Sequence, residues 1–115
     1  MMGDNKGLKV TYEDFLNMHF CIGEVIECTE VRNSKKLLVF KVRIGEQTRQ
    51  IVSSLRDYCE PQQMIGKKVT VLTNLEPIIM GGMPSEGVIL SAEDKNGVLS
   101  LIVPEKEVEV GAEVC

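Results

Sequence analysis

The chain has few of the residues on which enzyme chemistry depends. It contains one histidine in 115 residues, His19, and no identifiable nucleophile to pair with it. It has no glycine-rich motif that would cradle a phosphate, and no spacing of side chains typical of a metal site. These absences predict a protein that is not an enzyme and that requires no cofactor and no metal ion.

Long apolar runs are also missing. None approaches the roughly 20 residues needed to span a bilayer, and residues 1–10 lack the apolar middle of a signal peptide. We therefore expect a cytoplasmic protein with no membrane partner. The length allows one domain, which we place at residues 11–115 after a flexible N-terminal segment, residues 1–10.

The cysteines are scattered, without a Cys-x-x-Cys pair: they are Cys21, Cys28, Cys59 and Cys115. This usage is typical of isolated, buried thiols in a reducing compartment, with an exposed free thiol at the C-terminal position. The alternative is a zinc site built from His19, Cys21 and distant cysteines, but the spacing does not support it.

Positive charge is in short supply. Thirteen basic residues stand against 17 acidic ones, for a net charge of −4. Because phosphate neutralisation supplies much of the affinity for nucleic acid, this balance argues against strong, charge-driven binding. It still allows a local basic patch, because several acids cluster after Pro104 and leave the middle of the chain comparatively basic: Glu105, Glu107, Glu109 and Glu113.

What the chain does have is a run of strand patterns. Thr11 and Asp14 fit a capping box and predict a short N-terminal helix. A phase slip beside Gly23 predicts a bulge in the first strand. Alternation then predicts strands over residues 37–44, 48–52, 69–73, 88–90 and 98–103, with a helical turn within residues 54–65 and an apolar loop over residues 78–84. Together these predict an all-β fold, a five-stranded OB-fold Greek-key barrel with a helical insertion between strands 3 and 4.

A set of short motifs then resembles one family in the right order. The motifs are Phe15 and residues 21–25, 34–38, 49–53, 65–69, 74–77 and 84–90. The sequence is similar to the tRNA-binding domain appended to some aminoacyl-tRNA synthetases, especially methionyl-tRNA synthetase, and to free-standing CsaA-type export chaperones. The resemblance implies a homodimer that binds tRNA with little sequence preference, alone or with an aminoacyl-tRNA synthetase.

The candidate tRNA-binding residues combine cations with polar groups of the matched motifs: Lys35, Lys36, Lys41, Arg49, Asn74, Ser85 and Glu86. The two loop lysines lie where such barrels grip nucleic acid, or simply keep a loop end solvated. Lys41 and Arg43 are expected to form an exposed basic stripe with Arg49. Asn74 and Ser85 could bond phosphate or ribose, or instead hold a turn and the backbone.

Two further motif residues have open roles. Glu86 is an unusual neighbour for phosphate, so an internal hydrogen bond is at least as reasonable for it. Gly87 is expected to permit a close backbone approach or an unusual dihedral angle.

The chain departs from the family at three presumed contact positions, where Cys21, Ile78 and Ile79 replace cations. Fewer phosphate contacts predict weaker tRNA binding. The apolar residues 78–83 suit core or dimer packing, or a peptide-binding patch. Aromatic side chains for base stacking are scarce as well: the three phenylalanines are assigned to the core, which leaves Tyr12 and Tyr58.

Three functions remain open. The first is a tRNA-binding module, the second a CsaA-like peptide-binding chaperone, and the third a dimerisation module with attenuated RNA binding.

Overall fold

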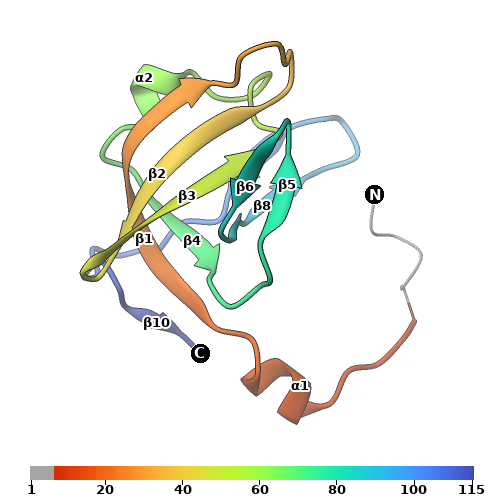
Figure 1. Ribbon diagram of the computed structural model, residues 1–115. Coiled ribbons are helices and arrows are strands. Elements are labelled where there is room, and N and C mark those ends of the chain that lie inside the picture. The colour runs from red at the N-terminus through yellow and green to blue at the C-terminus, as the bar shows by residue number, and fades with distance from the viewer. Residues whose placement is uncertain (1–6) are drawn as a thin grey trace.

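The computed structural model describes residues 7–115, which form a curled antiparallel sheet closed into a half-barrel (Figure 1). The strand order of the main sheet is β3-β2-β1-β4-β7. Its members are β1 (Phe20–Glu30), β2 (Leu38–Ile44), β3 (Gln47–Ser53), β4 (Lys68–Leu72) and β7 (Val88–Ile89), with β10 (Glu113–Val114) beside β1. The predicted all-β OB-type barrel is confirmed. Part of the N-terminal segment, residues 1–6, lies outside the described residues.

Short elements complete the fold. Two hairpins extend from the barrel, β5 (Ile78–Met80) with β6 (Met83–Ser85) and β8 (Ser91–Glu93) with β9 (Leu99–Leu101). The helices are α1 (Tyr12–Leu16) and α2 (Pro61–Met64). Helix α2 lies between β3 and β4, as predicted, and buries Met64 against the barrel.

Strand β1 coils so that it can serve two neighbours. Its pairing with β2 shifts register between Val25 and Glu27, which is the predicted bulge. Gly23 passes so close to β2 that an added Cβ would lie 2.5 Å from Cγ1 of Val42. The absence of a side chain at Gly23 therefore lets the first half of β1 pair with β4 while the second half pairs with β2.

The barrel interior is filled by branched and aromatic side chains from these strands. The side chains with no exposed surface are Val25, Leu38, Phe40, Val42, Ile51, Val69 and Val71. Each such burial contributes about 1.5–3 kcal/mol, so this layer dominates the stability of the fold.

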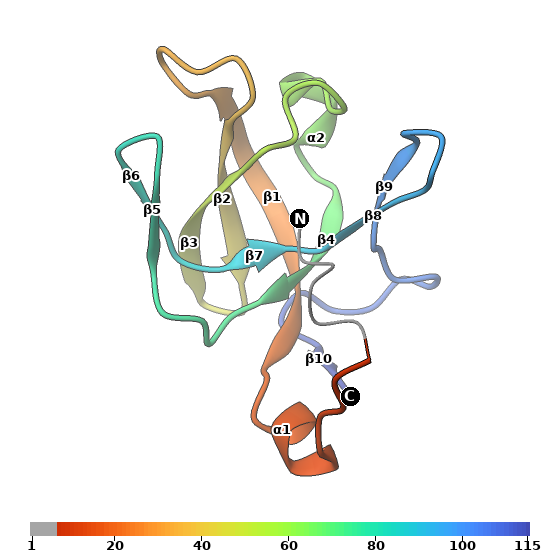
Figure 2. The same cartoon turned by 90° about the vertical axis from the view of Figure 1, so that its right-hand side faces the viewer.

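Helix α1 begins with the predicted capping box. The side chain of Thr11 accepts from the N–H of Asp14, whose carboxylate in turn accepts from the N–H of Thr11, both at 3.0 Å. The helix buries no residue and projects from the barrel beside β10 (Figure 2). Phe15 is consequently 40% exposed, and its assignment to the core was wrong because its helix does not pack on the barrel.

The segment predicted as an apolar loop is instead the β5–β6 hairpin. Gly81 and Gly82 occupy its turn with φ values of 58° and 79°. A two-residue hairpin turn of this twist requires positive φ at both positions, which glycine adopts without strain. Adjacent glycines were thus a hairpin signal rather than a loop signal.

Candidate nucleic-acid interface

The connection between β1 and β2 presents two of the predicted contact residues to solvent. Asn33 turns the chain with a φ of 64°. The hydroxyl of Ser34 accepts hydrogen bonds from the N–H groups of Lys36 and Leu37, at 3.3 and 3.1 Å. The loop is therefore held by its own polar groups, while the Lys35 and Lys36 side chains are exposed.

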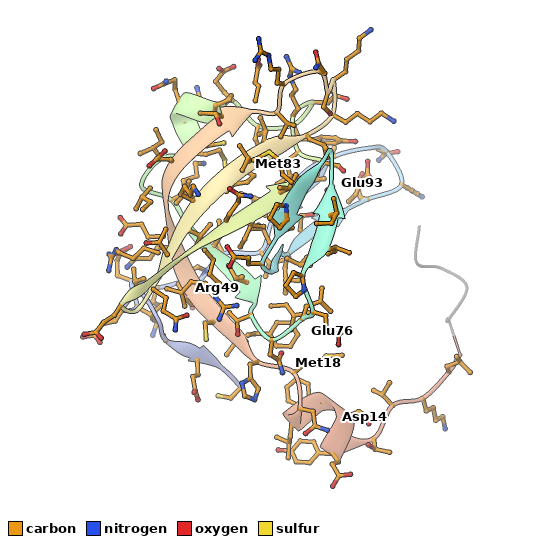
Figure 3. All side chains as sticks on the ribbon, in the orientation of Figure 1. Asp14, Met18, Arg49, Glu76, Met83 and Glu93 are labelled. Atoms are coloured by element: carbon orange, nitrogen blue, oxygen red, sulfur yellow. The ribbon has the colours of Figure 1, made fainter. Side chains whose placement is uncertain are left out.

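A further arginine supports this loop from the segment after β3. The Arg56 guanidinium donates to the carbonyl of Ser34 and pairs with Glu30 at 2.9 Å, and its backbone N–H donates to the carbonyl of Lys36 at 3.1 Å. Nitrogen-tipped side chains accordingly gather around the β1–β2 connection (Figure 3). We call this cluster the basic loop; its members are Arg32, Lys35, Lys36 and Arg56. Sequence reasoning missed Arg56, because only the fold brings its irregular segment here.

The predicted basic stripe is not formed. In the β2–β3 register Lys41 lies opposite Gln50, whereas Arg49 lies opposite Val42, so Arg49 points to the other face of the sheet. Lys41 donates to the Gln50 side chain at 3.3 Å, and Arg43 is paired with Glu24 at 2.6 Å. The register therefore separates Arg49 from Lys41 and Arg43, which remain together on one face of β2.

Arg49 instead bridges backbone carbonyls at one end of the barrel. It donates to the carbonyl of Thr73 after β4 and, at 3.2 Å, to the carbonyl of Glu86. Figure 3 labels Arg49. A guanidinium suits this position because its several donors can satisfy carbonyls from two segments at once.

Ser85 and Glu86 cover the open edge of β3. The Ser85 hydroxyl accepts from the N–H of Val52 at 2.9 Å, and the Glu86 carboxylate accepts from the N–H of Gln50 at 3.0 Å. The N–H of Glu86 returns a bond to the carbonyl of Gln50 at 2.8 Å. The edge that a barrel must protect is therefore paired by this motif.

Gly87 makes the approach that its motif suggested. Its φ is 154°, and an added Cβ would lie 2.8 Å from the carbonyl oxygen of Leu72. Only glycine fits there without displacing backbone.

Asn74 ties the turn after β4 to the α1–β1 junction. Its side-chain oxygen accepts from the N–H of His19 at 2.9 Å, and its amide donates to the carbonyl of Asn17 at 2.6 Å. In this arrangement its polar groups are used internally, as are those of Ser85 and Glu86. Among the predicted cations, Lys35 and Lys36 are exposed, whereas Lys41 and Arg49 are half-buried.

The cysteines are not joined by disulfides. All four thiols are free, and burial together with the neighbouring Cys59 raises the pKa of Cys28 to about 11. Residues 7–115 hold no group of three or more His, Cys, Asp or Glu side chains placed to bind a metal ion. None of the helices in that range is long and apolar enough to cross a membrane.

Comparison with known proteins agrees with the fold and the motifs. A family model described as "Putative tRNA binding domain" matches residues 20–113. Methionine–tRNA ligase of Bacteroides fragilis is 40% identical over 105 residues, which are 91% of this chain but only 16% of the ligase. Methionine–tRNA ligase of Archaeoglobus fulgidus is 43% identical over 107 residues, 93% of this chain and 16% of that ligase.

Solved structures extend the likeness over most of both chains. A MetRS-related protein from Pyrococcus horikoshii superimposes with a TM-score of 0.87 at 31% identity, covering 93% of this chain and 98% of that one. The chaperone CsaA of Bacillus anthracis superimposes with a TM-score of 0.83 at 23% identity, covering 93% of this chain and 99% of that one, which shows a shared fold. The chain therefore belongs to the tRNA-binding domain family, whose relatives include a segment of methionine–tRNA ligases.

Proposed function

We propose that this chain is a non-catalytic module that binds tRNA through the basic loop, in the cytoplasm, alone or together with a methionyl-tRNA synthetase. The observation that carries the proposal is that Arg32, Lys35 and Lys36 lie exposed on one loop of a chain whose net charge is −4, while Arg56, paired with Glu30, holds that loop in place. Cations of this kind contact phosphates, which position RNA without reading its sequence, so sequence preference is low.

The test is a tRNA titration at two salt concentrations. Each phosphate contact contributes about 0.7–0.9 to the slope of log affinity against log salt, so the double variant Lys35→Ala, Lys36→Ala should flatten the slope by about 1.4–1.8. The matched control, Lys95→Ala with Lys106→Ala, removes two exposed lysines from other surfaces. Equal losses in both double variants, or no tRNA binding by the folded wild-type protein at low salt, would overturn the proposal.

The proposed assembly is a homodimer formed through α1 and β10. Their apolar side chains line a common groove of about 250 Å³, with Tyr12, Leu16, Met18 and Val114 among its lining residues. Tyr12 is 74% exposed in the single chain. A second copy of this chain is the occupant that would remove such a surface from water.

A second candidate function, peptide binding, rests on the β5–β6 hairpin. Ile78 and Ile79 of β5 are 45% and 68% exposed. If this surface binds apolar peptides, Ile79→Asp should lower the affinity for a fluorescein-labelled apolar peptide. The fold-loss in peptide affinity should be at least as large as any fold-loss in RNA affinity. The control is Ile102→Asp, which places the same charge on an exposed isoleucine after β9. Unchanged peptide binding in folded Ile79→Asp would exclude this function.

A dimer without affinity for either tRNA or peptide would indicate a dimerisation module.

A further inference from the structure

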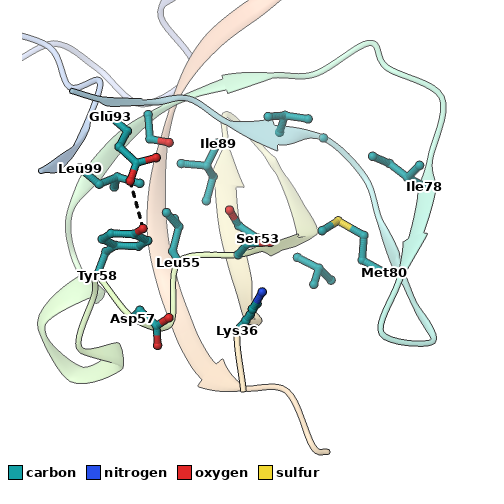
Figure 4. A pocket seen from close by; sticks show the side chains of 15 residues that line it. Lys36, Ser53, Leu55, Asp57, Tyr58, Ile78, Met80, Ile89, Glu93 and Leu99 are labelled. Carbon is teal, nitrogen blue, oxygen red and sulfur yellow. Dashed lines mark hydrogen bonds between the residues drawn. The ribbon is translucent and has the colours of Figure 1, made fainter. Parts of the chain in front are cut away.

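A groove opens directly beside the basic loop. Its cavity volume is about 590 Å³, within the range of small-ligand sites. Lys36 lies at one rim, Ile78 and Met80 of β5 form one wall, and Tyr58 and Glu93 form the opposite wall (Figure 4). The groove therefore connects the basic loop, which is proposed to bind phosphates, to an interior that is mainly apolar.

The interior combines apolar side chains with one aromatic ring. Leu55 and Ile89 belong to the buried core and form part of the lining. Tyr58 remains 47% exposed, so its ring is accessible from the groove. A planar, unstacked base is the part of an RNA that gains most from such a ring, because stacking is favourable for any base.

The polar end of the groove is an oriented carboxylate. The Tyr58 hydroxyl donates to Oε2 of Glu93 at 3.2 Å, which joins the segment after β3 to β8 (Figure 4). Among the hydrogen bonds of residues 7–115, none involves Oε1 of Glu93. The carboxylate therefore retains acceptor capacity toward the groove.

We propose that this groove holds one unpaired guanine of the bound RNA, stacked on Tyr58 and read by Glu93. The inference rests on the proposed RNA binding and names the base chemistry that goes with it. Guanine presents two adjacent N–H donors, N1–H and N2–H, and these match the two oxygens of one carboxylate. Adenine and cytosine place an acceptor beside their amino group, and uracil flanks its single N–H with carbonyls.

Charge sets the direction in which the nucleotide enters. Glu93 and Asp57 both line the groove and repel phosphate, whereas Lys36 at the rim attracts it. The base therefore points inward and its phosphate stays at the basic loop. One such contact adds a preference at a single position, while the rest of the RNA is held through its phosphates.

The experiment uses labelled single-stranded RNA pentamers that differ only at the centre: UUGUU, UUAUU, UUCUU and UUUUU. Wild-type protein should bind UUGUU about tenfold more tightly than UUAUU, as expected for one bidentate base contact. Glu93→Gln should abolish this preference. Glu105→Gln removes the same charge from an exposed acid that does not line the groove, so it should keep the preference and raise affinity for all four pentamers equally.

The tyrosine is tested by a pair of variants. Tyr58→Ala should lower the affinity for all four pentamers by about tenfold, because every base loses its stacking surface. Tyr58→Phe keeps the ring and should restore most of that affinity, with a smaller guanine preference because Glu93 loses its hydroxyl donor. Far-UV circular dichroism and urea midpoints establish that each variant is folded.

The outcomes separate this inference from the proposed function. If tRNA binding depends on Lys35 and Lys36 but Glu93→Gln behaves like Glu105→Gln, the groove holds no guanine and the proposed function stands. If the wild-type protein binds neither tRNA nor any pentamer, both the proposed function and the guanine site are excluded. If a lysine-containing apolar peptide binds instead, and only Glu93→Gln weakens it, the groove is a peptide site and the guanine assignment is wrong.

Discussion

At the scale of single residues, Ser85 and Glu86 of the family motif direct their side chains to the edge of β3. Ser85 and Glu86 use their side chains where a neighbouring strand would use its backbone, and so pair the edge of β3. Ser85 is only 1% exposed, with its hydroxyl also donating to the carbonyl of Gly87 at 3.0 Å. The hydrogen bonds of these two side chains therefore contribute to closing the barrel.

Replacing Ser85→Ala should therefore lower the free energy of unfolding by about 1–3 kcal/mol, because the buried N–H of Val52 loses its acceptor. Urea titration measures the change, with Ser54→Ala as a control at an exposed position of the same region. If Ser85 serves mainly as an RNA contact, stability would instead stay near wild type while tRNA affinity fell.

Cys28 makes stability depend on alkaline pH. The unfolded chain loses this thiol proton near the ordinary pKa of 9.0, whereas burial holds the folded pKa at about 11. The unfolded state thus binds fewer protons above pH 9, and the free energy of unfolding should fall as pH rises from 9 toward 11. Urea titrations across this range should show a smaller fall in Cys28→Val than in Cys115→Val, whose thiol is exposed. Equal slopes would exclude this contribution.

At the scale of elements, the β5–β6 hairpin combines an exposed apolar strand with a residue that pairs the edge of the sheet. It presents Ile78 and Ile79 on a short strand and positions Ser85 at the edge of β3. Its geometry depends on a glycine turn whose second position, Gly82, has open space around it. Any cost of substitution at Gly82 is therefore backbone strain rather than a clash.

Gly82→Ala should destabilise the protein by about 1–2 kcal/mol, the cost of a left-handed conformation for a residue with a Cβ. Gly82→Asn should cost less, because asparagine tolerates this region better. Urea midpoints of the two variants check the order. A Gly82→Ala variant as stable as the wild-type protein would mean that strain at this turn does not affect the stability of the fold.

At the scale of the whole molecule, the two proposed surfaces lie at opposite ends. The β1–β2 connection is at the top of the barrel and α1 with β10 at the bottom, in both views (Figures 1 and 2). A dimer joined through α1 and β10 would carry its two basic loops at its outer ends. Loss of the dimer should then remove avidity and leave the binding surface of each chain intact.

Leu16→Asp should give a monomer in sedimentation experiments, because it places a charge in the proposed apolar interface. Val98→Asp, at the exposed turn between β8 and β9, should leave the dimer intact. The monomer should retain tRNA binding that still depends on Lys35 and Lys36. A monomeric wild-type protein, or a Leu16→Asp dimer, would exclude the proposed interface.

The sequence by itself determined the barrel. Alternating apolar residues predict strands, the capping box predicts α1, and the slip beside Gly23 predicts the bulge, because all of these depend on interactions between residues close together along the chain. The family motifs are also short, contiguous segments, so they can be identified in the sequence alone. The same local patterns predict that Lys35 and Lys36 are exposed, because they lie in a polar loop between two clear strands.

Only the tertiary structure decided which side chains meet. The strand register separated Arg49 from Lys41, and the packing of the segment after β3 brought Arg56 to the basic loop. It also placed Tyr58 against Glu93, 35 positions away in the chain. Such pairings depend on the register and closure of the barrel, so no local pattern records them, and the groove beside the basic loop exists only once the strands are in place.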